Sequence, residues 1–324
     1  MPVDPILVPF LPGMLPLPEE IDDFHAFRTK EDQAANAFVD QICEPAPPGA
    51  VRREVQIPVD GGTVALHIFT PAGPGPHPVH FYIHGGGWVG GSIHHTYIDI
   101  LCSERAVGAD CVVVTVEYRK APEHKFPTGL NDCYAALLWV AEHTDELGAR
   151  ADLITIGGGS AGANLAAAVA LKARDEDGPQ LALQLLEVPA LDLTLSAPSH
   201  QRNATGYGLT ANDIHKLLGY YLASPEQARH PYASPLLADD LTGLPPAYIL
   251  SAEYDPLCDD GPAYTRRLTE AGVPATFSLQ EGQIHVSPAM TKILPAARAW
   301  REEVLTALRN THQQATHPQV TDAN

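Results

Sequence analysis

The chain has 324 residues, of which 45% are hydrophobic and 18% are charged, a composition typical of globular proteins with a buried core. Its formal net charge of −19 argues against nucleic acid or an anionic membrane surface as a partner. This length is sufficient for one large α/β domain or two ordinary domains.

No targeting or membrane segment is predicted. Residues 1–17 are proline-rich and lack a basic region followed by a continuous apolar stretch, so they do not form a secretory signal. No run approaches the ~20 apolar residues of a membrane helix. The cysteines are odd in number, lack metal-ligand spacing and therefore fit free thiols in a reducing cytoplasm. They are Cys43, Cys102, Cys111, Cys133 and Cys258. We expect a cytoplasmic protein without stable membrane insertion.

Strands alternate with helices along most of the chain, which predicts a mostly parallel sheet covered on both faces. A helix is predicted over 22–43, and two alternating strands over 51–58 and 64–70 follow it. Further strands are predicted over 79–83, 111–118, 153–156, 181–188, 247–251 and 275–279. Further helices are predicted over 97–107, 130–144, 161–174, 262–271 and 289–308.

Residues 190–245 interrupt this alternation. They hold one short helical stretch, 211–222, between loops rich in Pro, Ser and Gly, so we expect an insertion over the end of the sheet. The polar C-terminus lacks periodicity and is predicted to be disordered. The resulting division is an N-terminal segment (1–48), a core in two parts (49–189 and 246–309), the insertion (190–245) and the tail (310–324).

The run 158–162, Gly-Gly-Ser-Ala-Gly, follows an apolar strand and passes directly into an alanine-rich helix. This is the strand–turn–helix context of a nucleophile elbow. In so tight a turn Ser160 takes a strained backbone conformation, and Gly158 and Gly162 avoid side-chain clashes. Taken alone, the pentapeptide fits an ordinary glycine-rich turn equally well.

A serine nucleophile needs a base, and the base needs an orienting carboxylate. In sheets of this kind both follow the serine, the acid first. Asp255 and His285 each follow a late predicted strand, at the sheet edge where the elbow opens. Asp259 and Asp260 are rivals for the acid role, and the pair Asp255-Pro256 also fits a surface turn. His285 is the only histidine after residue 230 that precedes the polar tail.

A glycine run directly after the strand 79–83 supplies a third element. In the run 84–88, His-Gly-Gly-Gly-Trp, backbone N–H groups are open to an oxyanion. The N–H of the residue after the nucleophile, Ala161, completes such a hole. A phosphate-binding loop is the competing interpretation, but no Lys-Ser or Lys-Thr follows the glycines.

These motifs, in this order, resemble the hormone-sensitive-lipase-like esterases. The motifs that carry the resemblance are the runs 84–88, 118–123, 158–165 and 255–257. The resemblance implies an α/β-hydrolase fold with a helical cap, built from the N-terminal helix and the 190–245 insertion. It also implies cofactor-free hydrolysis of carboxylic esters with short to medium acyl chains.

The same resemblance implies site residues in this chain. Ser160 is then the nucleophile, His285 the base and Asp255 the group that orients it. The oxyanion N–H groups come from Gly86, Gly87 and Ala161.

Some positions depart from the family pattern. Gly159 stands where the family usually has Asp, and Ala163 where it usually has Gly, so a subfamily specificity tied to that Asp is in doubt. Glu187 precedes Val-Pro where relatives often have Tyr-Pro. Its carboxylate is either a buried, paired group or faces the pocket, and we favour the buried, paired group. Arg119 and Glu123 are interpreted as braces behind the oxyanion glycines.

Pocket residues are assigned from chain position alone. Trp88 is expected on the acyl side of the pocket. The residues expected to close it from the cap are Tyr207, Leu209, Leu217 and Leu218. The pair His94-His95 has no matching Cys, Asp or His cluster along the sequence, so no metal is predicted.

The sequence therefore predicts a serine carboxylesterase that acts on a small-molecule ester through an acyl-enzyme, with acyl transfer as a side activity. The alternatives on the same fold are a non-catalytic small-molecule receptor and an amidase. No cofactor is predicted, and the sequence leaves a homodimer open.

Overall fold

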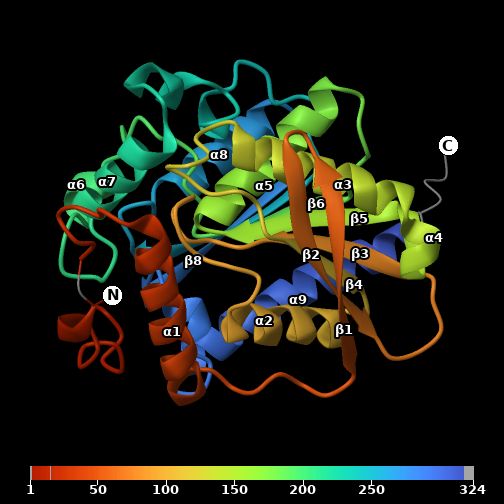
Figure 1. Cartoon of the computed structure of the whole chain (residues 1–324), viewed down its shortest axis with the longest axis horizontal. Coiled ribbons are helices and arrows are strands. Elements are labelled where there is room, and N and C mark those ends of the chain that lie inside the picture. The colour runs from red at the N-terminus through yellow and green to blue at the C-terminus, as the bar shows by residue number, and fades with distance from the viewer. Residues whose placement is uncertain (1, 15, 317–324) are drawn as a thin grey trace, which may run out of the picture.

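The computed structural model describes residues 2–14 and 16–316 and is built around one eight-stranded sheet (Figure 1). The strand order is β1-β2-β4-β3-β5-β6-β7-β8. β1 and β4 each pair antiparallel with β2, and all later neighbours pair parallel. The strands are β1 (Ala50–Val59), β2 (Gly62–Pro71), β3 (His77–Ile83), β4 (Val112–Val116), β5 (Ala149–Gly159), β6 (Leu183–Glu187), β7 (Ala247–Tyr254) and β8 (Ala275–Ile284). The predicted mostly parallel α/β sheet is confirmed.

Helices cover both faces of the sheet, with α3, α5 and α8 on one face and α2 and α9 on the other (Figure 1). The strand β4 shows why, because its fully buried valines alternate between the two hydrophobic cores. Val112, Val114 and Val116 belong to the first core and Val113 to the second. The helices are α1 (Phe24–Ile42), α2 (Thr96–Gly108), α3 (Thr128–Glu142), α4 (Thr144–Leu147), α5 (Ala161–Asp175), α6 (Ser199–Arg202), α7 (Ala211–Tyr221), α8 (Asp260–Glu270) and α9 (Pro295–Thr316).

The C-terminal helix differs from the sequence-based expectation at both ends. A 3₁₀ turn, Ser287–Ala289, occupies the predicted start, and α9 begins only at Pro295. The prediction of disorder from residue 310 is wrong over 310–316, because α9 continues to Thr316. The ring of His312 is buried there, with Nδ1 3.2 Å from the carbonyl oxygen of Ala109. Residues 317–324 of the predicted tail lie outside the described residues.

Segment 190–245 holds α6, α7 and two 3₁₀ turns, and it lies beside α1 and the N-terminal residues (Figure 1). The N–H of Leu17 donates to Oδ1 of Asp213 at 2.8 Å, and the rings of Phe24 and Tyr220 meet edge to face at 4.8 Å. These contacts join both α1 and the segment that precedes it to α7 across a long stretch of sequence. Within the described residues, no helix has both the length and the apolar character that crossing a membrane requires.

Candidate active site

Ser160 lies in the tight turn between β5 and α5, with φ of 57° and ψ of −120°. The flanking glycines are required by packing. A Cβ at Gly158 would lie 2.4 Å from the carbonyl group of Gly162, and one at Gly162 would lie 2.1 Å from the carbonyl oxygen of Ile83. The N–H of Ser160 donates to the carbonyl oxygen of Glu187 at 2.9 Å. The turn therefore holds a strained serine at the carboxyl edge of the sheet.

The structure brings Asp255 and His285 to this serine. Asp255 follows β7, is buried, and accepts a hydrogen bond from Nδ1 of His285 at 2.6 Å. Nε2 of His285, which follows β8, lies 2.9 Å from Oγ of Ser160. A carboxylate can only accept, so Nδ1 carries the proton and Nε2 accepts from the serine hydroxyl. This is the arrangement in which an imidazole acts as general base toward a hydroxyl.

The two rival aspartates are engaged elsewhere. Asp259 forms an ion pair with Arg202 at 2.7 Å. Oδ2 of Asp260 accepts from the N–H groups of Leu191 and Asp192 at 2.8 and 3.1 Å. Burial raises the pKa of Asp260 to about 8, so near neutral pH this group is largely protonated. Asp255 is thus the aspartate of the three that contacts His285.

The glycine loop after β3 lies next to the elbow. Gly86 and Gly87 have φ of 122° and 60°, which disfavour any other residue. A Cβ at Gly86 would lie 2.3 Å from the carbonyl oxygen of Gly90. Within residues 2–14 and 16–316, neither the Gly86 nor the Gly87 N–H donates to the protein, and Ala161 carries the first N–H of α5. Three backbone donors are therefore available near Ser160.

Arg28 of α1 ties the N-terminal helix to this loop. Its Nε donates to the carbonyl oxygen of Val89 and its Nη2 to that of Ala121, both at 2.7 Å. Glu123 holds the same guanidinium at 2.6 Å, so it braces the loop through Arg28. Arg119 instead pairs with Asp132 at 2.7 Å, away from the glycines. The interpretation of these two residues as braces agrees with the contacts of Glu123 but not with those of Arg119.

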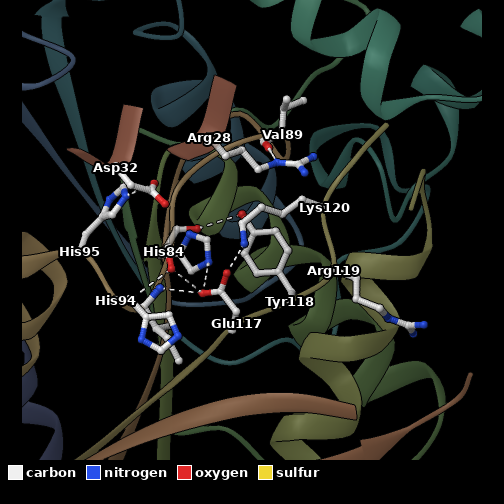
Figure 2. Close-up of polar contacts among 12 residues, drawn as sticks. Arg28, Asp32, His84, Val89, His94, His95, Glu117, Tyr118, Arg119 and Lys120 are labelled. Carbon is white, nitrogen blue, oxygen red and sulfur yellow. Dashed lines mark hydrogen bonds and ion pairs between the residues drawn. The ribbon is translucent and has the colours of Figure 1, made fainter. Parts of the chain in front are cut away.

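A second support is a charged cluster behind the loop, formed by His84, Glu117 and Lys120 (Figure 2). The carboxylate of Glu117 accepts from the Ile93 N–H at 2.7 Å and from Oγ of Ser92 at 3.1 Å, and it contacts the Lys120 ammonium. The Nε2 atom of His84 lies 3.9 Å from the same carboxylate. Glu117 thereby fixes the stretch that follows the glycines.

Burial sets the protonation state of His84, and neighbouring groups set that of Glu117. Burial lowers the pKa of His84 to about 4, so the ring is neutral near pH 7. Burial alone would raise the pKa of Glu117, but His84, the Lys120 charge and the Ile93 N–H outweigh that effect and lower it to about 2. The loop is therefore held by an ionised carboxylate and a neutral imidazole.

Glu187 is buried and paired, as expected, and it also borders the cavity over Ser160 that is described below. Its carboxylate contacts the guanidinium of Arg105, and Nε1 of Trp300 donates to it at 3.1 Å. This buried ion pair lies behind Ser160, because the carbonyl oxygen of Glu187 accepts from the N–H of Ser160.

The packing at Gly159 does not require glycine. A Cβ at this position would meet only the Tyr82 hydroxyl, at 3.4 Å.

A cavity of about 580 Å³ opens over Ser160 and His285. Trp88 and Leu209 line it, together with Leu217 from α7. Tyr207 is not among its lining residues in the described part of the chain. Its ring packs on Tyr254 instead, 4.8 Å between centroids. A second hollow of about 730 Å³, bordered by Asp192, Asp259 and Arg267, contains no residue of the Ser160 site.

Two side chains that support the site were not recognised from the sequence. Asn164 accepts from the Trp88 indole at 3.2 Å, and its amide donates to the carbonyl oxygens of Ala190 and Ala233. Arg28 is the other. Asn164 lies one turn after Ser160, a position that could have indicated a role near the site. Nothing in the pattern of the predicted helix 22–43 distinguished Arg28.

Known proteins resemble this chain across most of its length. A family model described as the alpha/beta hydrolase fold matches residues 80–288. Carboxylesterase NlhH of Mycobacterium tuberculosis is 42% identical over 236 residues, covering 72% of this chain and 73% of that protein. An arylesterase of Saccharolobus solfataricus is 35% identical over 287 residues, covering 88% and 92%. The solved structure of a hyperthermophilic esterase from Pyrobaculum calidifontis superposes with a TM-score of 0.88 at 35% identity, covering 96% of this chain and 99% of that one.

Proposed function

Since this chain belongs to the hormone-sensitive-lipase-like carboxylesterases of the α/β-hydrolase superfamily, we propose that it hydrolyses short- to medium-chain carboxylic esters through an acyl-enzyme on Ser160. The observation that carries this proposal is the continuous hydrogen-bonded relay from Asp255 through His285 to Ser160, 2.6 and 2.9 Å long in its two steps. No metal or cofactor takes part in the proposed steps.

The proposed reaction begins when Oγ of Ser160 attacks the ester carbonyl and its proton passes to Nε2 of His285. Asp255 keeps the imidazole in the Nδ1–H tautomer and stabilises the imidazolium that forms. His285 then gives the proton to the leaving alcohol, which departs as the acyl-enzyme forms. Water, activated by the same imidazole, releases the acid and restores Ser160. An alcohol that replaces this water would receive the acyl group, which is the proposed side activity.

Backbone N–H groups of Gly86, Gly87 and Ala161 are proposed to hold the oxyanion of each tetrahedral intermediate. Their support comes from the open donors and from the loop's position beside Ser160. Fixed donors of this kind stabilise the developing charge without reorganising, and each is worth about 3–4 kcal/mol of barrier.

Residues from α1 and α7 support the proposal that these elements form a cap. Phe27, Glu31 and Ala35 of α1, with Ile214 and Leu217 of α7, contribute to the cavity wall. A largely apolar wall of this size suits a short to medium acyl chain rather than a polymer.

The five cysteines are buried free thiols, which supports a cytoplasmic location.

The test is the Ser160→Ala variant, assayed with p-nitrophenyl esters of increasing acyl length. We expect kcat to fall by about 10⁶-fold, as for removal of other serine nucleophiles, with Ser103→Ala on α2 as the unaffected control. A serine-directed phosphonate should label the native chain once and leave Ser160→Ala unlabelled. Undiminished turnover in Ser160→Ala would sink the mechanism, and absence of labelling in the native chain would favour a receptor.

A further inference from the structure

Three potential metal ligands meet away from the Ser160 cavity, where the β1–β2 ribbon passes the loop that follows the oxyanion glycines. Glu54 of β1 and His67 of β2 are directly paired across the two strands. The ring of His94, which lies on the loop, meets the ring of His67 edge to face at 4.9 Å between centroids. One ligand atom from each of the three residues lies within 4.8 Å of the other two.

The spacing of the first two ligands already suits a metal ion. Nε2 of His67 lies 3.1 Å from Oε2 of Glu54. Zinc binds nitrogen and carboxylate oxygen at about 2.0–2.2 Å, which places two tetrahedral ligands about 3.4 Å apart. The side chains of Glu54 and His94 are exposed, so a shift of about 1–2 Å by them is sufficient to bring the third ligand into the same sphere.

The surroundings of His67 prepare its Nε2 for coordination. The ring is buried, and its Nδ1 faces Oδ1 of Asp99 at 3.8 Å. Both atoms are buried, and neither has a hydrogen-bond partner within the described residues. A proton on Nδ1 would serve Asp99 and leave the Nε2 lone pair to the metal, which is the usual carboxylate–histidine–metal arrangement.

The charges around the cluster are mixed. Arg52 pairs with Asp99 at 2.6 Å, and its positive charge opposes a cation. Glu54 supplies the compensating negative charge and has no arginine or lysine within ion-pair distance in the described residues.

We propose that Glu54, His67 and His94 bind one divalent transition-metal ion of the zinc class, with water completing its coordination. Two imidazoles and one carboxylate suit such an ion, whereas Mg²⁺ and Ca²⁺ prefer sites made of oxygen. When the metal binds, the Glu54–His67 hydrogen bond is exchanged for two metal–ligand bonds.

The location gives the ion a structural consequence. His94 directly follows Ile93, whose N–H is held by Glu117 in the cluster behind the oxyanion loop (Figure 2). Coordination of His94 from the β1–β2 ribbon therefore anchors the far end of that loop to the sheet. Because the ion binds only the folded chain, it also raises the melting temperature by mass action.

Calorimetric titration of the tag-free, EDTA-treated full chain with ZnCl₂ tests the proposal. We expect one ion per chain, with affinity reduced at least about tenfold in His94→Ala and in Glu54→Gln. His95→Ala is the matched control, because His95 pairs with Asp32 at 2.5 Å outside the cluster and should leave binding unchanged. MgCl₂ should give no comparable heat.

Two outcomes would overturn the site: no saturable zinc binding by the native chain at millimolar metal, or equal affinity in the native chain and His94→Ala. Both altered side chains are exposed, and circular dichroism checks that these variants remain folded. Ser160→Ala should bind zinc as the native chain does, so the result is independent of the proposed esterase chemistry.

Discussion

The two sides of Ser160 are built differently. On the side of β7 and β8, Asp255 and His285 reach the serine through their own side chains. On the side of β3, Gly86 and Gly87 offer backbone N–H groups, and the side chains around them, such as Arg28 and Glu117, hold the loop from behind. The proposed catalytic groups are thus two side chains on one side and backbone N–H groups of a supported loop on the other. Single substitutions on the two sides of Ser160 should therefore lower kcat by different amounts.

The side-chain half of the site should give the largest loss. Asp255→Asn keeps the size of the residue but favours the wrong imidazole tautomer, so we expect kcat to fall by about 10⁴-fold with little change in KM. Steady-state kinetics on a p-nitrophenyl ester measure this. Asp259→Asn is the matched control, since Asp259 pairs with Arg202, and equal losses in both variants would contradict the assignment of the acid.

In the glycine loop, substitutions should lower kcat by displacing the backbone. Gly86→Ala places a methyl group 2.3 Å from the carbonyl oxygen of Gly90 at a φ of 122°, so the loop must move. Loss of one oxyanion donor predicts a fall in kcat of about 10²–10³-fold. In Gly90→Ala the added methyl group lies 3.6 Å from the Gly86 carbonyl oxygen, an ordinary contact, and activity should persist. A Gly86→Ala enzyme with native kcat would show that this N–H is not used.

The cluster behind the glycine loop should make the free energy of unfolding depend on pH. This is the smallest of the three expected effects. Burial lowers the pKa of His84 from its ordinary 6.5 to about 4, so the unfolded chain takes up a proton before the folded chain does. The contribution of His84 to the free energy of unfolding is complete above pH 6.5 and is lost as the pH falls toward 4. For this group we expect about 2 kcal/mol of unfolding free energy to disappear between pH 7 and pH 5.

Urea unfolding at a series of pH values measures this loss. His84→Gln should flatten the acid slope relative to the native chain, whereas the exposed His124→Gln should not. The buried His67, His80, His200 and His312 also have lowered pKa values, so the native slope contains their contributions as well. An identical slope in His84→Gln would mean that the folded and unfolded chains take up the His84 proton over the same pH range, so that burial does not lower its pKa.

The same contrast explains what the sequence could predict. The elbow and the glycine loop are local, because tight turns and open N–H groups demand glycines at fixed spacing, and the structure has these turns where they were expected. The late loops could be placed because parallel strands deliver their carboxyl ends to one edge. For these reasons the fold, the elbow and the positions of Ser160, Asp255 and His285 could be derived from residue patterns and the family resemblance.

Contacts between distant segments could not be derived in this way. Tyr207 was expected at the pocket, but the path of the chain after α6 directs its ring to Tyr254. The polar residues after 309 gave no periodic signal, yet α9 continues through them to Thr316 and His312 is buried with its ring against the carbonyl oxygen of Ala109. The ligand cluster at His94 depends on the cross-strand pairing of Glu54 with His67 and on the loop that passes them. No residue spacing along the sequence predicts this contact among the three residues.

The Arg28 contacts have a consequence for the catalytic cycle. One guanidinium holds the helix α1 to the carbonyl oxygens of Val89 and Ala121 and to Glu123. The position of α1 and the geometry of the glycine loop are therefore coupled through one side chain. A displacement of α1 that breaks these bonds would leave the loop with the Glu117 contacts as its remaining support described above.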